Sequence, residues 1–155
     1  KVNIDYHHYR TIIVVKARLN FARLARKLAS EGKNEKAVAV LDHCMEVLPL
    51  SEIPYDPYMP DVVDAYFAAG QNEKAISMAK DFCDYQYQLL DYYFRQTPYV
   101  VSSSEFEIQT GIQYSSRVAN SCAEYGNQEL ADEINKQLEG YYTYYLQSQQ
   151  PGGLK

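Results

Sequence analysis

Tryptophan and long apolar stretches are both missing from this sequence of 155 residues. The longest strongly apolar run is Ile12 to Val15, whereas a helix that crosses a bilayer needs about 20 apolar residues. No segment of the sequence therefore resembles a membrane span. The apolar fraction of 46% and the charged fraction of 23% are ordinary for a soluble globular chain, so we expect one domain with an apolar core.

Cysteine is scarce, with three residues at widely spaced positions. A structural metal site would need two close pairs of ligands, and Cys44, Cys83 and Cys122 offer none. A chain of this length buries about 70% of the surface of its unfolded form, so it needs no disulfide framework. Each cysteine lies among apolar residues at helical spacing, and we expect three buried thiols. A disulfide between Cys44 and Cys83 is the alternative.

Patterns of catalytic residues are also lacking. No glycine-rich phosphate loop is present, and no serine or cysteine nucleophile can be matched with a histidine by spacing. His7 and His8, with Asp5 nearby, could be metal ligands, but adjacent histidines point in different directions and no third ligand follows. Asp61 and Asp64 could act as paired carboxylates, but a solvated helix face is the favoured explanation. We therefore expect a protein that is not an enzyme, with no cofactor and no metal.

Charge is distributed unevenly along the chain. Residues 10–36 carry eight basic and two acidic side chains, whereas residues 37–155 carry six basic and seventeen acidic ones. The acidic body argues against nucleic acid as the main partner. The basic first segment places Lys16, Arg23 and Lys27 near one helix face, and there it would dock on the acidic body or lie against anionic lipid.

Three of the seven glycines open the same short phrase. In each copy a glycine is followed by polar residues and, five positions after the glycine, by an alanine: Gly32 to Ala37, Gly70 to Ala75 and Gly126 to Ala131. Glycine after a helical run ends the helix, because it takes the left-handed conformation without steric cost. Asn or Gln followed by Glu is typical of the next helix start. The phrase therefore predicts the tight turn of a helical hairpin, repeated three times.

Apolar periodicity places about six helices around these turns. An extended lead-in (1–10) would be followed by one helical domain (11–146), made of hairpins at 11–48, 57–95 and 104–146, and by a disordered tail (147–155). The six expected helices are 11–30, 35–48, 57–69, 73–95, 104–125 and 128–146. Asp56 and Pro57 are typical of a helix cap and first turn. A capping box is expected from one of two pairs, Ser102 with Glu105 or Ser104 with Glu107.

Overlaying the hairpins shows a shared pattern of large, small and aromatic anchors before the alanine. The anchors are Phe21, Leu24, Ala25 and Leu28, then Met59, Val62, Val63 and Tyr66, then Ser115, Val118, Ala119 and Cys122. In all three copies the last anchor precedes the alanine by nine residues. This pattern resembles the tetratricopeptide repeat and implies an all-α fold, an irregular solenoid of three antiparallel helical hairpins. The copies are 38 and 56 residues apart rather than about 34, and Ser115 and Asn135 put polar groups at two anchors of the third copy.

A narrower resemblance covers mainly residues 10–95. Arg10-Thr11, the run from Leu41 to Pro49 and the run from Ile53 to Met59 look like the C-terminal soluble region of multi-spanning membrane proteins from Bacteroides-like bacteria, related to protein O-mannosyltransferases. The resemblance implies the accessory domain of a larger, membrane-associated protein, with the periplasmic side favoured. It carries over no catalytic residue. The chain begins with Lys1 rather than Met, and we expect it to be an excised part of such a protein.

In repeat proteins of this kind the first helices of the hairpins line a concave groove. That groove would present six residues from the three first helices: Arg23, Arg26, Asp64, Phe67, Arg117 and Asn120. Mixed charge with one aromatic ring suits a short peptide or a chain terminus, because arginine can hold a carboxylate with two hydrogen bonds. An unoccupied polar groove is the alternative interpretation. We expect a docking module for a peptide, a protein partner or another domain of the parent chain.

Tyrosine is abundant, with 16 residues, and four of them crowd into the last helix at Tyr141, Tyr142, Tyr144 and Tyr145. Such rings usually fill wide gaps between helices with the hydroxyl at the rim. Four rings within five residues cannot all be buried on one helix face, so some should be exposed. Exposed rings would serve a glycan-binding surface or the interface of a homodimer, and these are the two alternatives to peptide docking.

Overall fold

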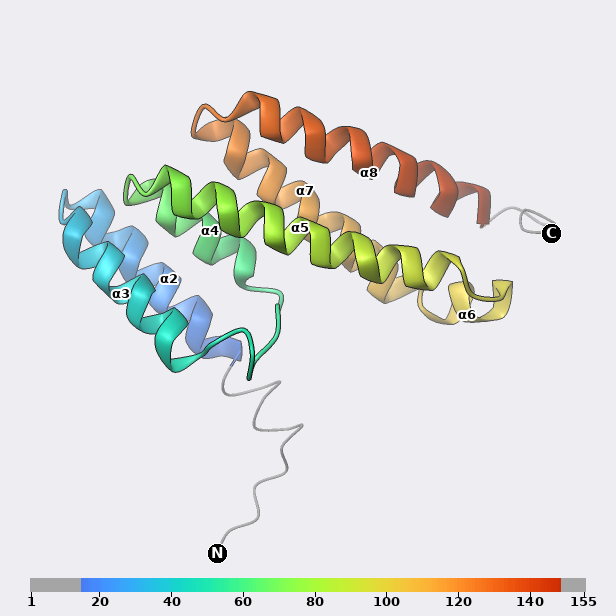
Figure 1. Cartoon of the computed structure of the whole chain (residues 1–155), viewed down its shortest axis with the longest axis horizontal. Coiled ribbons are helices and arrows are strands. Elements are labelled where there is room, and N and C mark those ends of the chain that lie inside the picture. Colours follow the sequence, from blue (N-terminus) through green and yellow to red (C-terminus); the bar gives the residue numbers. More distant parts are fainter. Residues whose placement is uncertain (1–14, 149–155) are drawn as a thin grey trace, which may run out of the picture. The chain divides into compact units, whose positions relative to one another are not determined.

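A computed structural model describes residues 15–148 of the chain (Figure 1). This part of the chain contains seven α-helices and no strand, which confirms the all-α class predicted from the sequence. The expected lead-in (1–10), with Asp5, His7 and His8, lies outside the described residues, as does most of the expected tail. No helix within residues 15–148 combines the length and the apolar character needed to cross a bilayer.

The chain divides into two compact units, unit 1 (Lys1–Ala79) and unit 2 (Lys80–Lys155), with the boundary inside helix α5 (Asn72–Phe94). Unit 1 contains α2 (Val15–Ser30), α3 (Asn34–Val47), α4 (Met59–Ala68) and the first turns of α5. Helix α2 packs against both α3 and α4, and α3 also contacts α4 (Figure 1). Small side chains are buried where these helices meet, among them Ala22, Ala25 and Ala37, and small residues allow helices to approach closely.

All three glycine turns are present as predicted. Gly32, Gly70 and Gly126 have φ angles of 73°, 78° and 82°, in the left-handed region that favours glycine. In the first turn the amide of Gly32 donates to the carbonyl of Ala29 (2.9 Å), and the amide of Lys33 donates to the carbonyl of Leu28 (2.9 Å). The other two turns repeat this pair of bonds, which defines the Schellman motif.

The Schellman motif explains the constant nine-residue spacing. In each copy the last anchor supplies the carbonyl that accepts the long bond, the glycine follows four residues later, and the alanine lies in the first turn of the next helix. Ala37, Ala75 and Ala131 each donate to the carbonyl four residues earlier, and each is 0% exposed. The turn therefore places a buried alanine at a set distance from the last anchor.

The connector between α4 and its predecessor differs from the prediction. Asp56 was expected to cap a helix starting at Pro57, but α4 begins at Met59 and Tyr58 occupies the cap position without a side-chain bond. Asp56 accepts a hydrogen bond from the Tyr58 amide (2.8 Å) and forms an ion pair with Arg18. The Asp56 carboxylate therefore links the connector to Arg18 of α2 and does not cap α4.

Arg18 explains why Asp56 does not cap a helix. The Arg18 side chain is 0% exposed and holds the connector in place. Besides Asp56, its guanidinium donates to three backbone carbonyls: Leu48 (2.9 Å), Ile53 (2.6 Å) and Pro54 (2.9 Å). Burial raises the pKa of Asp56, and the Arg18 charge and the Tyr58 amide oppose that rise. One buried arginine thus satisfies backbone acceptors that a proline-rich segment cannot pair with itself.

Unit 2 contains the rest of α5, then α6 (Pro98–Ser103), α7 (Glu105–Glu124) and α8 (Gln128–Ser148). Leu90, Val101, Ile108 and Tyr145 form a buried cluster to which all four elements contribute, and partly buried side chains surround it: Tyr87, Tyr93, Phe94, Ile112 and Tyr141. The expected helices leave residues 96–103 as a connector, because Pro98 was interpreted only as the end of the preceding helix. Proline at the first position also starts a helix, since its missing N–H is not needed there.

Neither predicted capping box forms at the start of α7. Ser104 is the cap residue of α7 but makes no side-chain cap bond, and Ser102 lies within α6. Ser104 also ends α6, and its amide donates to the carbonyls of Val100 and Val101. Its backbone (φ −106°, ψ 21°) is therefore set by α6 and lacks the extended conformation that a capping side chain requires.

The three cysteines are free and buried, as expected. Burial raises the pKa of Cys44 and of Cys122 to about 11, and that of Cys83 to about 12. At neutral pH all three side chains are therefore neutral thiols, and they pack as small apolar groups. The alternative disulfide between Cys44 and Cys83 is absent.

Candidate ligand-binding groove

The groove residues predicted in unit 1 are partly used within the unit. Arg26 Nε lies 3.0 Å from Asp64 Oδ2, an ion pair that links α2 to α4. Asp64 is nearly buried, and Phe67 is 2% exposed, so its ring lies inside the protein instead of lining an open groove. Arg23 is exposed on α2. Ligand binding by these residues stays a prediction, and Arg23 and Arg26 are the ones accessible to a ligand.

Arg117 and Asn120, the groove residues predicted in unit 2, both lie exposed on α7. They are three residues apart and therefore share a helix face. A joint surface of these two with the residues of unit 1 stays a prediction.

The tyrosine cluster of α8 has one exposed, two partly buried and one buried ring. Tyr142 is 53% exposed and Tyr145 only 8%, while Tyr141 and Tyr144 lie between these values. The Tyr145 hydroxyl donates to Glu105 Oε1 (2.6 Å) and accepts from Gln109 Nε2 (2.7 Å), which ties α8 to α7. The exposure of Tyr142 agrees with the expectation that four crowded rings cannot all be buried.

A row of aromatic rings joins α8 to α5. The Tyr141 ring stacks between Tyr87 (centroids 5.6 Å apart, planes at 23°) and Phe94 (6.2 Å, 15°). Tyr87 and Phe94 are seven residues apart on α5 and so lie on one face, two turns from each other. Tyr144 meets the Phe94 ring edge-on at 4.8 Å. Tyr141 is therefore held by two rings of α5 and remains partly exposed.

The Tyr141 hydroxyl lies at the edge of this row. It donates to Asp91 Oδ1 at 2.8 Å, and Asp91 also lies 3.8 Å from Arg95 Nη2. Burial and the bond to Asp91 raise the pKa of Tyr141 to about 12. The hydroxyl therefore stays protonated and holds the carboxylate in place at neutral pH.

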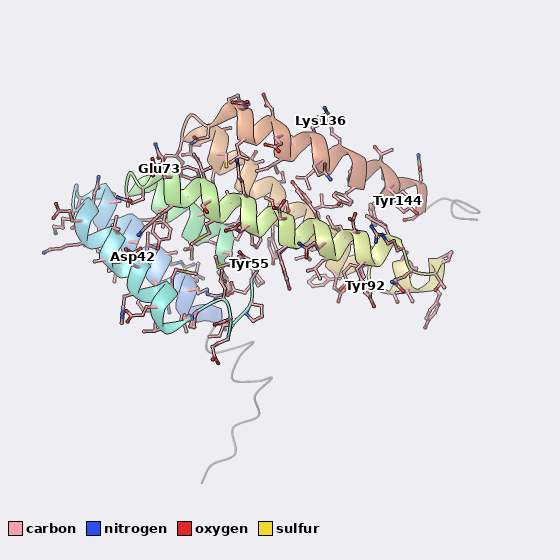
Figure 2. All side chains as sticks on the ribbon, viewed as in Figure 1. Asp42, Tyr55, Glu73, Tyr92, Lys136 and Tyr144 are labelled. Atoms are coloured by element: carbon pink, nitrogen blue, oxygen red, sulfur yellow. The ribbon has the colours of Figure 1, made fainter. Side chains whose placement is uncertain are left out.

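A cavity of about 430 Å³ opens beside these rings, in the size range of small-ligand sites. Its walls come from α5 and α8: Asp91, Phe94, Arg95, Lys136, Gln137, Gly140, Tyr141 and Tyr144. Figure 2 labels Lys136 and Tyr144 on α8 and Tyr92 on α5. We call this the central cavity.

Two further cavities adjoin the central one. A cavity of about 300 Å³ shares Gln137 with it and extends to Lys80 and Leu130. Another of about 340 Å³ shares Asp91 and Arg95 and extends to Tyr92 and Gln96. We call these three cavities together the α5–α8 groove; the third is lined by residues 88–96, which lie on α5 and at its C-terminal end.

Basic side chains outnumber acidic ones in the central cavity but not in the groove as a whole, where Asp84, Asp91 and Glu133 balance the three basic residues. Residues 80–148 contain ten acidic side chains and four basic ones, and three of the four basic residues line the groove: Lys80, Arg95 and Lys136. The central cavity alone has two cations and one carboxylate, and Asp91 is already engaged by Tyr141. In an acidic unit, the central cavity therefore favours an anionic group.

Gly140 is the residue of the groove that the sequence analysis missed. It lies in the interior of α8, where glycine costs about 0.5–1 kcal/mol relative to alanine. A Cβ atom there would meet no atom within 4 Å, so packing within the protein does not demand glycine. A glycine inside a predicted helix and away from a turn is the sequence signal that could have drawn attention to this position.

Within residues 15–148 no three His, Cys, Asp or Glu side chains gather in a way that could hold a metal ion. The groove offers aromatic and apolar walls, cations at its rim and a fixed carboxylate, which are the features of a binding site. Comparison with protein-family models, with curated proteins and with solved structures found nothing that matches this chain.

Proposed function

We propose that this chain is a non-catalytic docking module built of tetratricopeptide-like helical hairpins. The α5–α8 groove carries this proposal, because neighbouring cavities with aromatic and apolar walls and charged side chains are suited to a segment of a partner protein. The three Schellman turns and the constant distance from anchor to buried alanine support the repeat assignment. Three copies would stack into an irregular solenoid.

The resemblance over residues 10–95 extends this proposal to the parent protein. In that reading the module is the accessory part of a larger bacterial membrane protein with a glycosyltransferase-like region, on the periplasmic side. The exposed basic face of α2 then lies near the membrane surface. Lys16, Arg23 and Lys27 form that face, and anionic lipid attracts such residues by about 1 kcal/mol per cation.

Selection from a random-peptide library tests the docking function. The full 155-residue chain is immobilised, enriched peptides are synthesised, and their affinity is measured by isothermal titration calorimetry. We expect saturable binding that weakens in Arg95→Gln if the α5–α8 groove is used, and in Arg23→Gln if the predicted first-helix groove is used. Failure to enrich any peptide, together with failure to bind the parent protein's other domains, would refute the docking function.

A glycan-binding surface is the second candidate, and the exposed Tyr142 ring favours it. The stacking of Tyr141 with Tyr87 and Phe94 counts against it, because sugars stack on rings that the protein leaves free. Binding to a glycan array that is lost in Tyr142→Ala but kept in Tyr144→Ala would support this function. A homodimer interface would instead be indicated by a dimer that forms without any other ligand and whose dissociation constant rises in Tyr142→Ala.

A further inference from the structure

We propose that the central cavity binds a peptide segment in which a carboxylate lies next to an apolar side chain, and that the ligand's backbone approaches α8 at Gly140. This inference rests on the proposed docking function and assigns the class of ligand. Four observations on unit 2 carry it: a helix-interior glycine that internal packing does not explain, the placement of the cations, the engaged aromatic rings and the neighbouring cavities.

Gly140 indicates close approach by something that the chain itself does not supply. At Gly32, Gly70 and Gly126 the positive φ angle explains the glycine, but Gly140 has an ordinary helical conformation. No side chain or backbone occupies the space beside it, and it forms part of the cavity wall. A methyl group at this position would therefore project from the wall without disturbing the protein, and a ligand lying against the helix would meet it.

The cations select the ligand's charge. Lys136 is the only basic residue of α8 and lies exposed at the rim of the central cavity, opposite Arg95 of α5. Arg95 is held only loosely by Asp91, at 3.8 Å with its side chain 80% exposed. Both side chains can turn toward a carboxylate placed between the two helices. Asp91 remains fixed by the Tyr141 hydroxyl and can accept a backbone N–H of the same ligand.

The apolar walls select the body of the ligand. Phe94 and Tyr144 meet edge-on, and Tyr141 stacks with Tyr87 and Phe94, so the wall rings are already engaged with one another and do not form one flat platform. Such a surface takes a branched or aromatic side chain in a pocket. A sugar ring needs an open aromatic face. Two further cavities share wall residues with the central one, so a bound peptide can extend beyond it.

A fluorescein-labelled hexapeptide array tests the inference. It combines Glu or Asp with Leu, Ile, Phe or Tyr at neighbouring positions, and each member has a matched version with Gln or Asn. Affinity for the full chain is measured by fluorescence polarisation. We expect the acidic members to bind at least about tenfold more tightly than their amide counterparts, and the difference to shrink at high salt.

Gly140→Ala is the decisive variant, because it should separate stability from binding. Replacing a helix-interior glycine raises Tm by about 2–4 °C, while the added methyl group weakens peptide affinity at least tenfold. Asn135→Ala is the matched control: Asn135 is exposed on α8, outside the cavity wall, so the same gain in helix propensity should leave affinity unchanged. Lys136→Gln should weaken acidic peptides and leave their amide counterparts unaffected.

The other outcomes are distinct. Acidic peptides that bind Gly140→Ala and Lys136→Gln as tightly as the unaltered chain would overturn this inference and leave the docking function standing. Binding of none of the array members, with other peptides enriched in the random library, would have the same meaning. Selective binding of oligomers of glucuronic acid in a Gly140-dependent manner would overturn the choice of a peptide.

Discussion

Replacing Arg18 by methionine should cost unit 1 a large part of its stability. Methionine keeps much of the apolar stem but removes the guanidinium, which leaves Asp56 and three carbonyl groups without their donor. The pair is buried, with side chains 0% and 6% exposed, so solvent screening does not reduce the effect. Removing one partner of a buried ion pair costs about 3–5 kcal/mol.

Urea unfolding followed by far-UV circular dichroism measures this loss. For a denaturant slope of about 2 kcal/mol per molar urea, the expected change lowers the midpoint by about 2 M. Arg23→Met on the same helix is the control, because Arg23 is exposed and its replacement should change the free energy of unfolding by no more than about 0.5 kcal/mol. Equal midpoints for the two variants would refute the role assigned to Arg18.

The loss should also depend on pH, with a sign set by Asp56. Burial raises the pKa of this carboxyl above its unfolded value, and the Arg18 charge opposes the rise, so Arg18→Met raises the pKa further. A raised folded pKa contributes stability that is present at low pH and is lost as pH rises through that pKa. The midpoint difference between Arg18→Met and the unaltered chain should therefore be smaller at pH 5 than at pH 7. A difference that grows on acidification would contradict this.

Three further predictions concern the turns, the aromatic row and the thiols. Gly32→Ala should destabilise the chain by about 1–2 kcal/mol in thermal unfolding, because φ is 73° there, whereas the same change at Gly140 should stabilise it. Stability changes of the same sign at both positions would refute the role assigned to the φ angle. Tyr141→Phe keeps the ring stack but loses the bond to Asp91, so urea unfolding should show a loss of about 0.5–1.5 kcal/mol, and no loss would mean that the bond contributes nothing. In a thiol-titration assay the three cysteines should react only after denaturation, since they are buried and their pKa values are raised; fast native reaction would show open thiols.

The turns could be predicted from sequence because the physics there is local. A glycine after a helical run, polar residues and an alanine five positions later describe one backbone motif, and no distant residue has to be known. The class of fold followed from helical spacing for the same reason. Apart from the start of the first expected helix and the end of the last, which fall at the edges of the described residues, the expected helix bounds lie within two residues of the observed ones.

Arg18 and Asp56 were missed because their roles depend on contacts 38 residues apart in sequence. A basic residue is normally exposed, and a carboxylate before proline normally caps a helix. One signal was present: Arg18 lies on the apolar stripe, three residues after Val15 and four before Ala22. A charge in that position is buried only if a partner is supplied from elsewhere in the fold.

The candidate groove was predictable only in part. The crowding of tyrosines on α8 correctly indicated that some rings would be exposed, but Tyr141 lies in a stack whose other members belong to α5. Pairing between helices distant in sequence could not be read from either helix alone. The cations Arg95 and Lys136 looked like ordinary surface charges for the same reason.

The Schellman turns also determine where this chain can change its length. Each residue of a helix advances the next by about 100° around the axis, so one residue inserted between Gly70 and Ala75 would swing the alanine out of the interior and a polar neighbour into it. The turn between α5 and α6 (residues 95–97) has no glycine motif of this kind and contains exposed residues. Loop grafts and engineered insertions should therefore be better tolerated in that turn, and the glycine turns should be kept residue for residue.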